Sequence, residues 1–175
     1  MSGGGGWRWR GQGRPPFAVE PGPGQESVWD YPRPPRIEPD TRRVVVTDTD
    51  GSVIADTPAA LRVLETASPP TFYLPAADVD TTALVQAPGS SFCEWKGRAR
   101  YWALRDHPGR PVAWDYPAPT GAFAPIRGHF AFYPSRVACT VDGERVRAQA
   151  GDFYGGWITD EVVGPFKGDP GTGGW

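Results

Sequence analysis

The side chains with the greatest chemical potential gather between Ser91 and Pro134 of this 175-residue chain. This stretch holds both histidines, one of the two cysteines and three of the eight tryptophans. Within it, Cys93 and Lys96 could supply a nucleophile and its activating cation. An extended backbone would place two side chains at this spacing on opposite faces, which argues against direct contact. The alternative interpretation is a buried, inert cysteine beside a solvated lysine.

Further ionisable groups could take part in acid–base chemistry that needs no cofactor. Glu65 lies at the end of a segment expected to be helical, where it either faces a pocket or forms a surface ion pair with Arg62. Tyrosine phenols can also donate or accept protons. The catalytic candidates are therefore Glu65, Lys96 and Tyr101, with Tyr133 as a further acid or base.

The aromatic residues are more numerous than a core of this size needs. Tryptophan and tyrosine combine an apolar ring with a polar tip, and they therefore make good walls for a small-molecule pocket or cage. Tyr101 and Trp102 are adjacent, so they must point to opposite faces of a strand and cannot both line one cavity. The alternative is that the rings bury a sheet face beneath the terminal arms. The predicted ligand-binding residues are Tyr73, Cys93, Trp95, Trp102, Trp114, Tyr116 and Tyr133.

Composition and charge argue against several classes of protein. The net charge is −2 without any block of like charge, which disfavours a nucleic-acid partner and an anionic membrane surface. No apolar run approaches the ~20 residues that span a bilayer, and the N-terminus lacks the apolar region of a signal peptide. Cys93 and Cys139 form no CxxC motif, so we expect no metal and no cofactor. A cytoplasmic protein with reduced thiols fits these features best.

Short apolar runs predict a mainly β protein. Asp50-Gly51, a dipeptide favoured in type I′ turns, predicts a hairpin between strands at 43–48 and 52–55. Thr57-Pro58 predicts the start of one short helix from Pro58 to Thr66. Together with the remaining strands, these elements predict a compact curved antiparallel sheet or open barrel. The remaining strands are predicted at Thr71–Leu74, Arg98–Ala103, Val112–Tyr116, His129–Tyr133 and Arg136–Val141, with a second hairpin turn at Asp142-Gly143.

The length leaves room for a single core, with arms at both ends. Residues 1–24 are rich in Gly, Pro and Arg and predict a disordered tail, which includes Trp7. Residues 25–41 predict a proline-rich arm, and residues 42–150 the β-rich core. Residues 151–175 combine glycines with aromatic rings, which predicts an arm packed on the core.

Several motifs resemble one family of bacterial and fungal proteins. They are Cys93-x-Trp95-Lys96-Gly97, Ala113-Trp114-x-Tyr116-Pro117 and Ala131-Phe132-Tyr133-Pro134. Over roughly residues 43–141 the chain resembles the family catalogued as domain of unknown function 427, in a variant common in actinobacteria. The resemblance implies a compact β structure akin to the β-tent group. Because the paired CxxC knuckles of that group are missing from this sequence, the resemblance also implies no zinc. The family is filed under a nucleotidyltransferase label.

The sequence features are compatible with three functions. The first is a small-molecule-binding β domain with an aromatic-lined pocket, with or without acid–base catalysis. The second is a protein-interaction module or homodimer that uses the proline-rich arm or an aromatic groove. The third is nucleotidyl transfer, which needs carboxylates for magnesium and a backbone cradle for phosphate. The sequence has no GxxxxGK[ST] motif, and Pro165 removes an amide from the glycine-containing segment 164–168.

Overall fold

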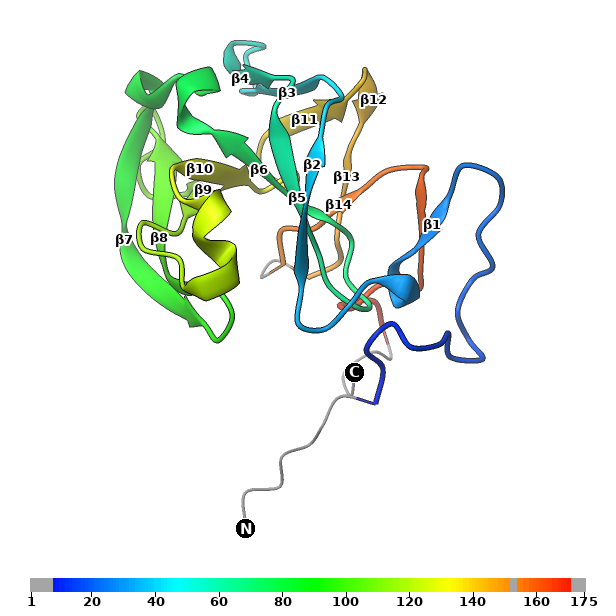
Figure 1. Ribbon diagram of the computed structural model, residues 1–175. Coiled ribbons are helices and arrows are strands. Elements are labelled where there is room, and N and C mark those ends of the chain that lie inside the picture. The colour runs from blue at the N-terminus through cyan, green and yellow to red at the C-terminus, as the bar shows by residue number, and fades with distance from the viewer. Residues whose placement is uncertain (1–7, 152–153, 171–175) are drawn as a thin grey trace.

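Antiparallel pairing dominates the chain. The computed structural model describes residues 8–151 and 154–170 (Figure 1). Its largest sheet has seven strands in the order β2–β5–β6–β10–β9–β8–β7, and β2 and β7 are the open edges. The prediction of a mainly β fold with an open sheet is therefore confirmed. The seven strands are β2 (Arg36–Asp40), β5 (Ala60–Leu64), β6 (Thr71–Pro75), β7 (Leu84–Cys93), β8 (Gly97–Leu104), β9 (Pro111–Asp115) and β10 (His129–Phe132).

A smaller antiparallel sheet has the order β12–β11–β3–β4 and lies at the top of Figure 1. Its strands are β3 (Val44–Thr47), β4 (Val53–Thr57), β11 (Ala138–Val141) and β12 (Glu144–Arg145). Two short pairs complete the sheets: β1 (Glu26–Ser27) with β15 (Val162–Val163), and β13 (Arg147–Ala148) with β14 (Trp157–Ile158). The described helices are short 3₁₀ turns: η1 (Val28–Asp30), η2 (Ala76–Asp78), η3 (Thr81–Ala83) and η4 (Gly121–Ile126).

The seven-stranded sheet buries side chains on both faces, because successive residues of a strand point to opposite sides. On β6, Phe72 contributes to the core that the large sheet shares with the small one, and Trp157 stacks on it with 4.7 Å between ring centroids. The next residue, Tyr73, contributes to a second, mostly aromatic core on the other face. The sheet therefore separates a mostly aliphatic core, called the aliphatic core below, from a mostly aromatic one, called the aromatic core.

The first hairpin is confirmed, but its turn differs in type. The Gly51 amide donates to the carbonyl of Asp48 at 3.0 Å, and only Gly51 of the Asp50-Gly51 pair has a positive φ, of 86°. A register shift between Val46 and Thr47 accompanies this turn. The second predicted turn does show the type I′ pattern, because both Asp142 and Gly143 have positive φ, of 47° and 82°.

The predicted helix from Pro58 to Thr66 is wrong: this segment forms the strand β5 between β2 and β6. Its apolar residues are buried on both faces of the sheet, and a short buried run has no periodicity that separates a strand from a helix. The Thr57 hydroxyl accepts from the Ala59 amide at 3.0 Å and donates to Asp78 at 2.7 Å, so it bridges two segments instead of capping a helix. The longest helix described is η4, which lies outside the strands and the helix predicted from the sequence.

Both terminal segments pack on one side of the core. Trp29 is fully buried. The rings of Trp9 and Phe17 pack edge-to-face with its indole, at centroid distances of 6.5 Å and 5.3 Å respectively. Its indole Nε1 donates to the carbonyl of Pro165 at 3.2 Å, and β1 pairs in parallel with β15. The N-terminal and C-terminal segments therefore hold each other in place. The proposed division at residues 24, 41 and 150 stays a prediction. Parts of the predicted N-terminal tail, including Trp7, and of the predicted C-terminal arm lie outside the described residues.

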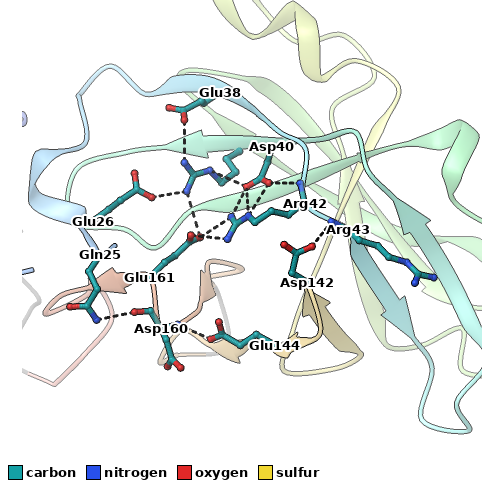
Figure 2. Close-up of polar contacts among 11 residues, drawn as sticks. Gln25, Glu26, Glu38, Asp40, Arg42, Arg43, Asp142, Glu144, Asp160 and Glu161 are labelled. Carbon is teal, nitrogen blue, oxygen red and sulfur yellow. Dashed lines mark hydrogen bonds and ion pairs between the residues drawn. The ribbon is translucent and has the colours of Figure 1, made fainter. Parts of the chain in front are cut away.

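An arginine cluster joins these segments to the sheet (Figure 2). Arg62 is buried on β5, with 6% of its surface exposed, and its guanidinium lies 3.0 Å from Glu26 and 3.3 Å from Glu38. The expected surface pair of Arg62 with Glu65 is therefore wrong. Arg42 bonds both Asp40 and Glu161. Burial acts to raise the pKa of Asp40, but the hydrogen bonds from Arg42 to this carboxylate outweigh burial and hold the pKa below its usual value. We call Arg42, Arg62 and their four carboxylate partners the arginine cluster; the partners are Glu26, Glu38, Asp40 and Glu161.

Across residues 8–151 and 154–170, none of the helices has the length and apolar character that crossing a membrane would require.

Candidate functional site

Most of the predicted site residues line one cavity on the aromatic face of the seven-stranded sheet. We call it the aromatic cavity, and its volume is about 300 Å³. Eight of the ten predicted residues contribute to its wall, namely Glu65, Tyr73, Cys93, Lys96, Tyr101, Trp114, Tyr116 and Tyr133. The described wall also contains Thr71, Ser91, Phe92, Ala99, Tyr154 and Gly155, which the sequence did not single out.

Strand register explains this convergence. Tyr101 on β8 pairs with Trp114 on β9, and Trp114 pairs with Ala131 on β10. Paired residues of neighbouring strands have their side chains on the same face. The small side chain of Ala99, also in the cavity wall, leaves space between the surrounding rings.

Trp114 is the centre of the aromatic wall. Its ring meets Tyr73 edge-on with centroids 6.4 Å apart, and it lies 4.6 Å from the ring of Tyr133. The Trp114 indole Nε1 donates to the Tyr73 hydroxyl at 3.4 Å. Burial raises the pKa of the Tyr73 and Tyr116 phenols well above the ordinary value. Both phenols therefore stay protonated at neutral pH and serve as walls or hydrogen-bond donors instead of bases.

Cys93 and Lys96 come together in the wall of this cavity. The lysine Nζ lies 3.8 Å from the cysteine Sγ. The expectation that they point apart fails, because β7 ends at Cys93 and the chain turns back at Gly97, whose φ is +99°. The Lys96 ammonium also lies 5.7 Å from the ring centroid of Tyr116. In the described part of the chain, Lys96 forms no ion pair with a carboxylate.

The remaining ionisable groups of the cavity have protein partners. Glu65 lies 3.9 Å from the guanidinium of Arg33, which is itself buried and donates to the carbonyl of Thr66. The Tyr101 hydroxyl and the Ser91 hydroxyl share a hydrogen bond of 2.7 Å. The negative charge of Glu65 is therefore partly neutralised, whereas no carboxylate of the described residues pairs with the positive charge of Lys96.

Two predicted residues do not reach the aromatic cavity. Trp102 lies on the opposite face of β8 from Tyr101, where it meets Phe130 edge-on at 5.6 Å between centroids. Its indole Nε1 donates to Asp115 at 2.8 Å. Trp95 sits half-buried in the turn after β7 and packs against the aromatic core without lining the cavity.

The C-terminal segment supplies a wall that the sequence analysis missed. Tyr154 and Gly155 line the cavity, and a Cβ atom at Gly155 would lie 2.1 Å from the ring of Trp114. Only glycine lets the backbone approach the ring this closely. The signal in the sequence is the glycine pair between two aromatic residues, but nothing local says which ring it covers.

A second, smaller cavity of about 130 Å³ adjoins the first. The two share Glu65, Thr71, Lys96, Tyr154 and Gly155 in their walls. We call the smaller one the lysine cavity, because Lys96 and Lys167 both line it; the other lining residues are Val63, Ser68, Pro69, Gln149 and Gly156. Within the described ranges, the structure groups no three His, Cys, Asp or Glu side chains so that they could hold a metal ion.

The fold and the cavities define an open antiparallel β domain with a partly enclosed aromatic site. The chain belongs to the family described as domain of unknown function (DUF427), whose model carries the label NTP_transf_9 and matches residues 36–143. This match confirms the resemblance inferred from the motifs. It includes the strands of the aromatic wall but neither Tyr154 nor Lys167. No curated protein matches the chain.

Proposed function

We propose that the aromatic cavity binds a small organic molecule with a flat or apolar body. The observation that carries this proposal is the gathering of Tyr73, Trp114 and Tyr133 around an open space. Protein cores are packed with few voids larger than a water molecule, whereas ligand pockets have volumes from roughly 300 Å³ upward. A cavity of about 300 Å³ therefore favours a binding site over the filling of a core.

Acid–base catalysis on the bound molecule is a second candidate function. Its support is that a carboxylate, an ammonium and a phenol share one cavity wall, namely those of Glu65, Lys96 and Tyr101. Such groups could exchange a proton with a bound molecule without a cofactor. The nucleotidyltransferase label has weaker support, because Glu65 is the one carboxylate among the described lining residues and it already faces Arg33.

The binding proposal can be tested with 3-phenylpropanol, a neutral probe with an aromatic ring. Isothermal titration calorimetry on the full chain should detect binding, and Tyr101→Ala should weaken it because this change removes part of the cavity wall. Trp102→Phe is the matched control, since its side chain is adjacent in sequence but lies on the other face of β8. Equal affinity in a folded Tyr101→Ala protein and the wild type would contradict the proposal.

Catalysis has its own test. In heavy water, proton NMR of a bound carbonyl compound such as phenylacetone should show loss of its acidic C–H signals, and Lys96→Gln or Glu65→Gln should slow this exchange. Exchange that proceeds at the uncatalysed rate would leave binding as the function of the cavity.

A further inference from the structure

The distribution of lysine in this chain is uneven. Among eighteen lysines and arginines, Lys96 and Lys167 are the two lysines, and all other cations are arginines. They are 71 positions apart in sequence, yet both line the lysine cavity. The arginine cluster shows how this protein uses cations for structure, namely as arginines bonded to carboxylates. The lysines therefore need a different explanation.

Backbone contacts position Lys167 at the cavity. Its amide donates to the carbonyl of Ala67 at 2.7 Å, and its carbonyl accepts a hydrogen bond from the side chain of Gln149. The Lys167 ammonium lies 5.5 Å from the ring centroid of Tyr154, a residue that borders both cavities. The main chain at Lys167 is thus fixed, while the ammonium lies at the wall that the two cavities share.

Neither ammonium is neutralised by a carboxylate of the residues that the structure describes. In the described segments, Lys96 and Lys167 make no ion pair with a carboxylate. Glu65 is the one carboxylate among the described residues of the wall, and Arg33 stands 3.9 Å from it. The lysine cavity therefore carries an excess of positive charge. Ser68 and Thr71 add hydroxyl groups that can donate hydrogen bonds.

We propose that the lysine cavity is an anion subsite of the aromatic cavity. The ligand would carry a carboxylate or phosphate group, held by Lys96 and Lys167, on an aromatic or apolar body that lies against Trp114. A lysine ammonium is a compact point charge that suits either kind of anion. This inference rests on the proposed function, and it names the chemical class of the ligand. It also gives the C-terminal segment a role in recognition, because Lys167 lies outside the part of the chain that the family model matches.

Three probes that share a phenyl ring but differ in the end group test this inference. They are neutral 3-phenylpropanol, 3-phenylpropanoate and 2-phenylethyl phosphate, measured by isothermal titration calorimetry on the full chain. At least one anion should bind about tenfold more tightly than the alcohol, the effect expected of hydrogen bonds to charged groups. The preferred anion then shows whether the subsite takes a carboxylate or a phosphate. Added salt should reduce this preference.

The variants separate the subsite from the aromatic cavity. Lys167→Gln should remove most of the preference for the anion, about a tenfold effect, and leave the affinity for the alcohol unchanged. Lys96→Gln should also reduce the preference for the anion; because Lys96 lines the aromatic cavity as well, this variant is judged by the ratio of its two affinities alone. Arg98→Gln is the matched control, because Arg98 is an exposed cation on the β7–β8 hairpin that lines neither cavity. The ratio of two affinities is measured on one protein, so a general loss of stability would not change it.

The outcomes are distinguishable. If the alcohol and both anions bind equally well, or if both lysine variants retain the preference, then the anion subsite is overturned and the proposed function stands. If none of the three probes binds to the folded protein, then the proposed function is contradicted together with the inference.

Discussion

Two groups of cations in this protein have opposite surroundings. In the arginine cluster, Arg42 and Arg62 form ion pairs with four carboxylates, and these contacts join β1, β2 and β5 to the turn before β15 (Figure 2). In the lysine cavity, Lys96 and Lys167 border open space and pair with no described carboxylate. The comparison indicates that the arginine cluster holds segments of the fold together, whereas the described part of the chain gives the two lysine ammonium groups no carboxylate partner.

The strongest test of this difference is a change in the arginine cluster. Arg62→Met would leave Glu26, Glu38 and Asp40 close together without their shared cation. Removing one partner of a buried ion pair strongly destabilises a protein, and since Glu26 and Glu38 are half-exposed we expect a loss of about 2–4 kcal/mol. Urea denaturation measures the free energy of unfolding.

The control for that measurement is Arg43→Met. Arg43 pairs with Asp56 in an exposed position, so the free energy of unfolding should hardly change. Lys167→Gln should also leave stability nearly unchanged. If Lys167→Gln destabilised the protein as much as Arg62→Met, then the contrast between structural and available cations would be wrong.

A second change should affect both the fold and the site. In Gly155→Ala the new Cβ would collide with the ring of Trp114, so the C-terminal segment must move away from the aromatic cavity. Overpacking of this kind costs about 1–3 kcal/mol, and probe binding should weaken as the wall is displaced. Calorimetry with 3-phenylpropanol gives the affinity. Gly109→Ala has no neighbouring atom within 4 Å and should change neither quantity.

The buried tyrosines of the aromatic core predict that the free energy of unfolding depends on pH. Burial raises the pKa of Tyr73 and Tyr116, while unfolded tyrosine titrates near 10. Above pH 10 the unfolded chain would therefore bind fewer protons than the folded one, so the free energy of unfolding should fall as pH rises. Urea midpoints between about pH 8 and 11 measure this effect. In the Tyr73→Phe variant the slope should become smaller; an unchanged slope would show that this phenol does not contribute.

The smallest expected effect is a difference in reactivity between the two cysteine thiols. Cys139 is fully buried in the aliphatic core, and burial raises the pKa of its thiol, so it should remain protonated and unreactive. Cys93 is half-buried at the aromatic cavity and should react first with iodoacetamide at pH 8. Mass spectrometry of tryptic peptides locates the label. If Cys139 in the folded protein were labelled as fast as Cys93, the burial of Cys139 in the aliphatic core would be contradicted.

Local sequence signals predicted much of the sheet. Alternation of side chains correctly separated Tyr101 from Trp102, and turn dipeptides located both hairpins. The segment from Pro58 to Thr66 was misjudged because a buried strand in the middle of a sheet has no polar face. Its neighbours β2 and β6 come from other parts of the chain, and pairing with them decides the structure.

The site was predictable only in part, for a related reason. Aromatic residues on adjacent strands could be expected to meet, but the contact between Cys93 and Lys96 depends on a turn that the local pattern did not reveal. The contacts of Arg62 with Glu161 and of Gly155 with Trp114 join residues far apart in the chain. Such long-range contacts leave no periodic signal, so the arginine cluster and the wall from the C-terminal segment emerged from the structure alone.

The most direct test of the aromatic cavity compares two indole groups by NMR. In a ¹H–¹⁵N spectrum, the Nε1–H signals of Trp114 and Trp102 report on the two faces of the seven-stranded sheet. Titration with 3-phenylpropanoate should shift the signal of Trp114, which lines the cavity, and leave that of Trp102 in place. If neither signal moves, or if Trp102 alone responds, then the aromatic cavity does not bind this class of molecule.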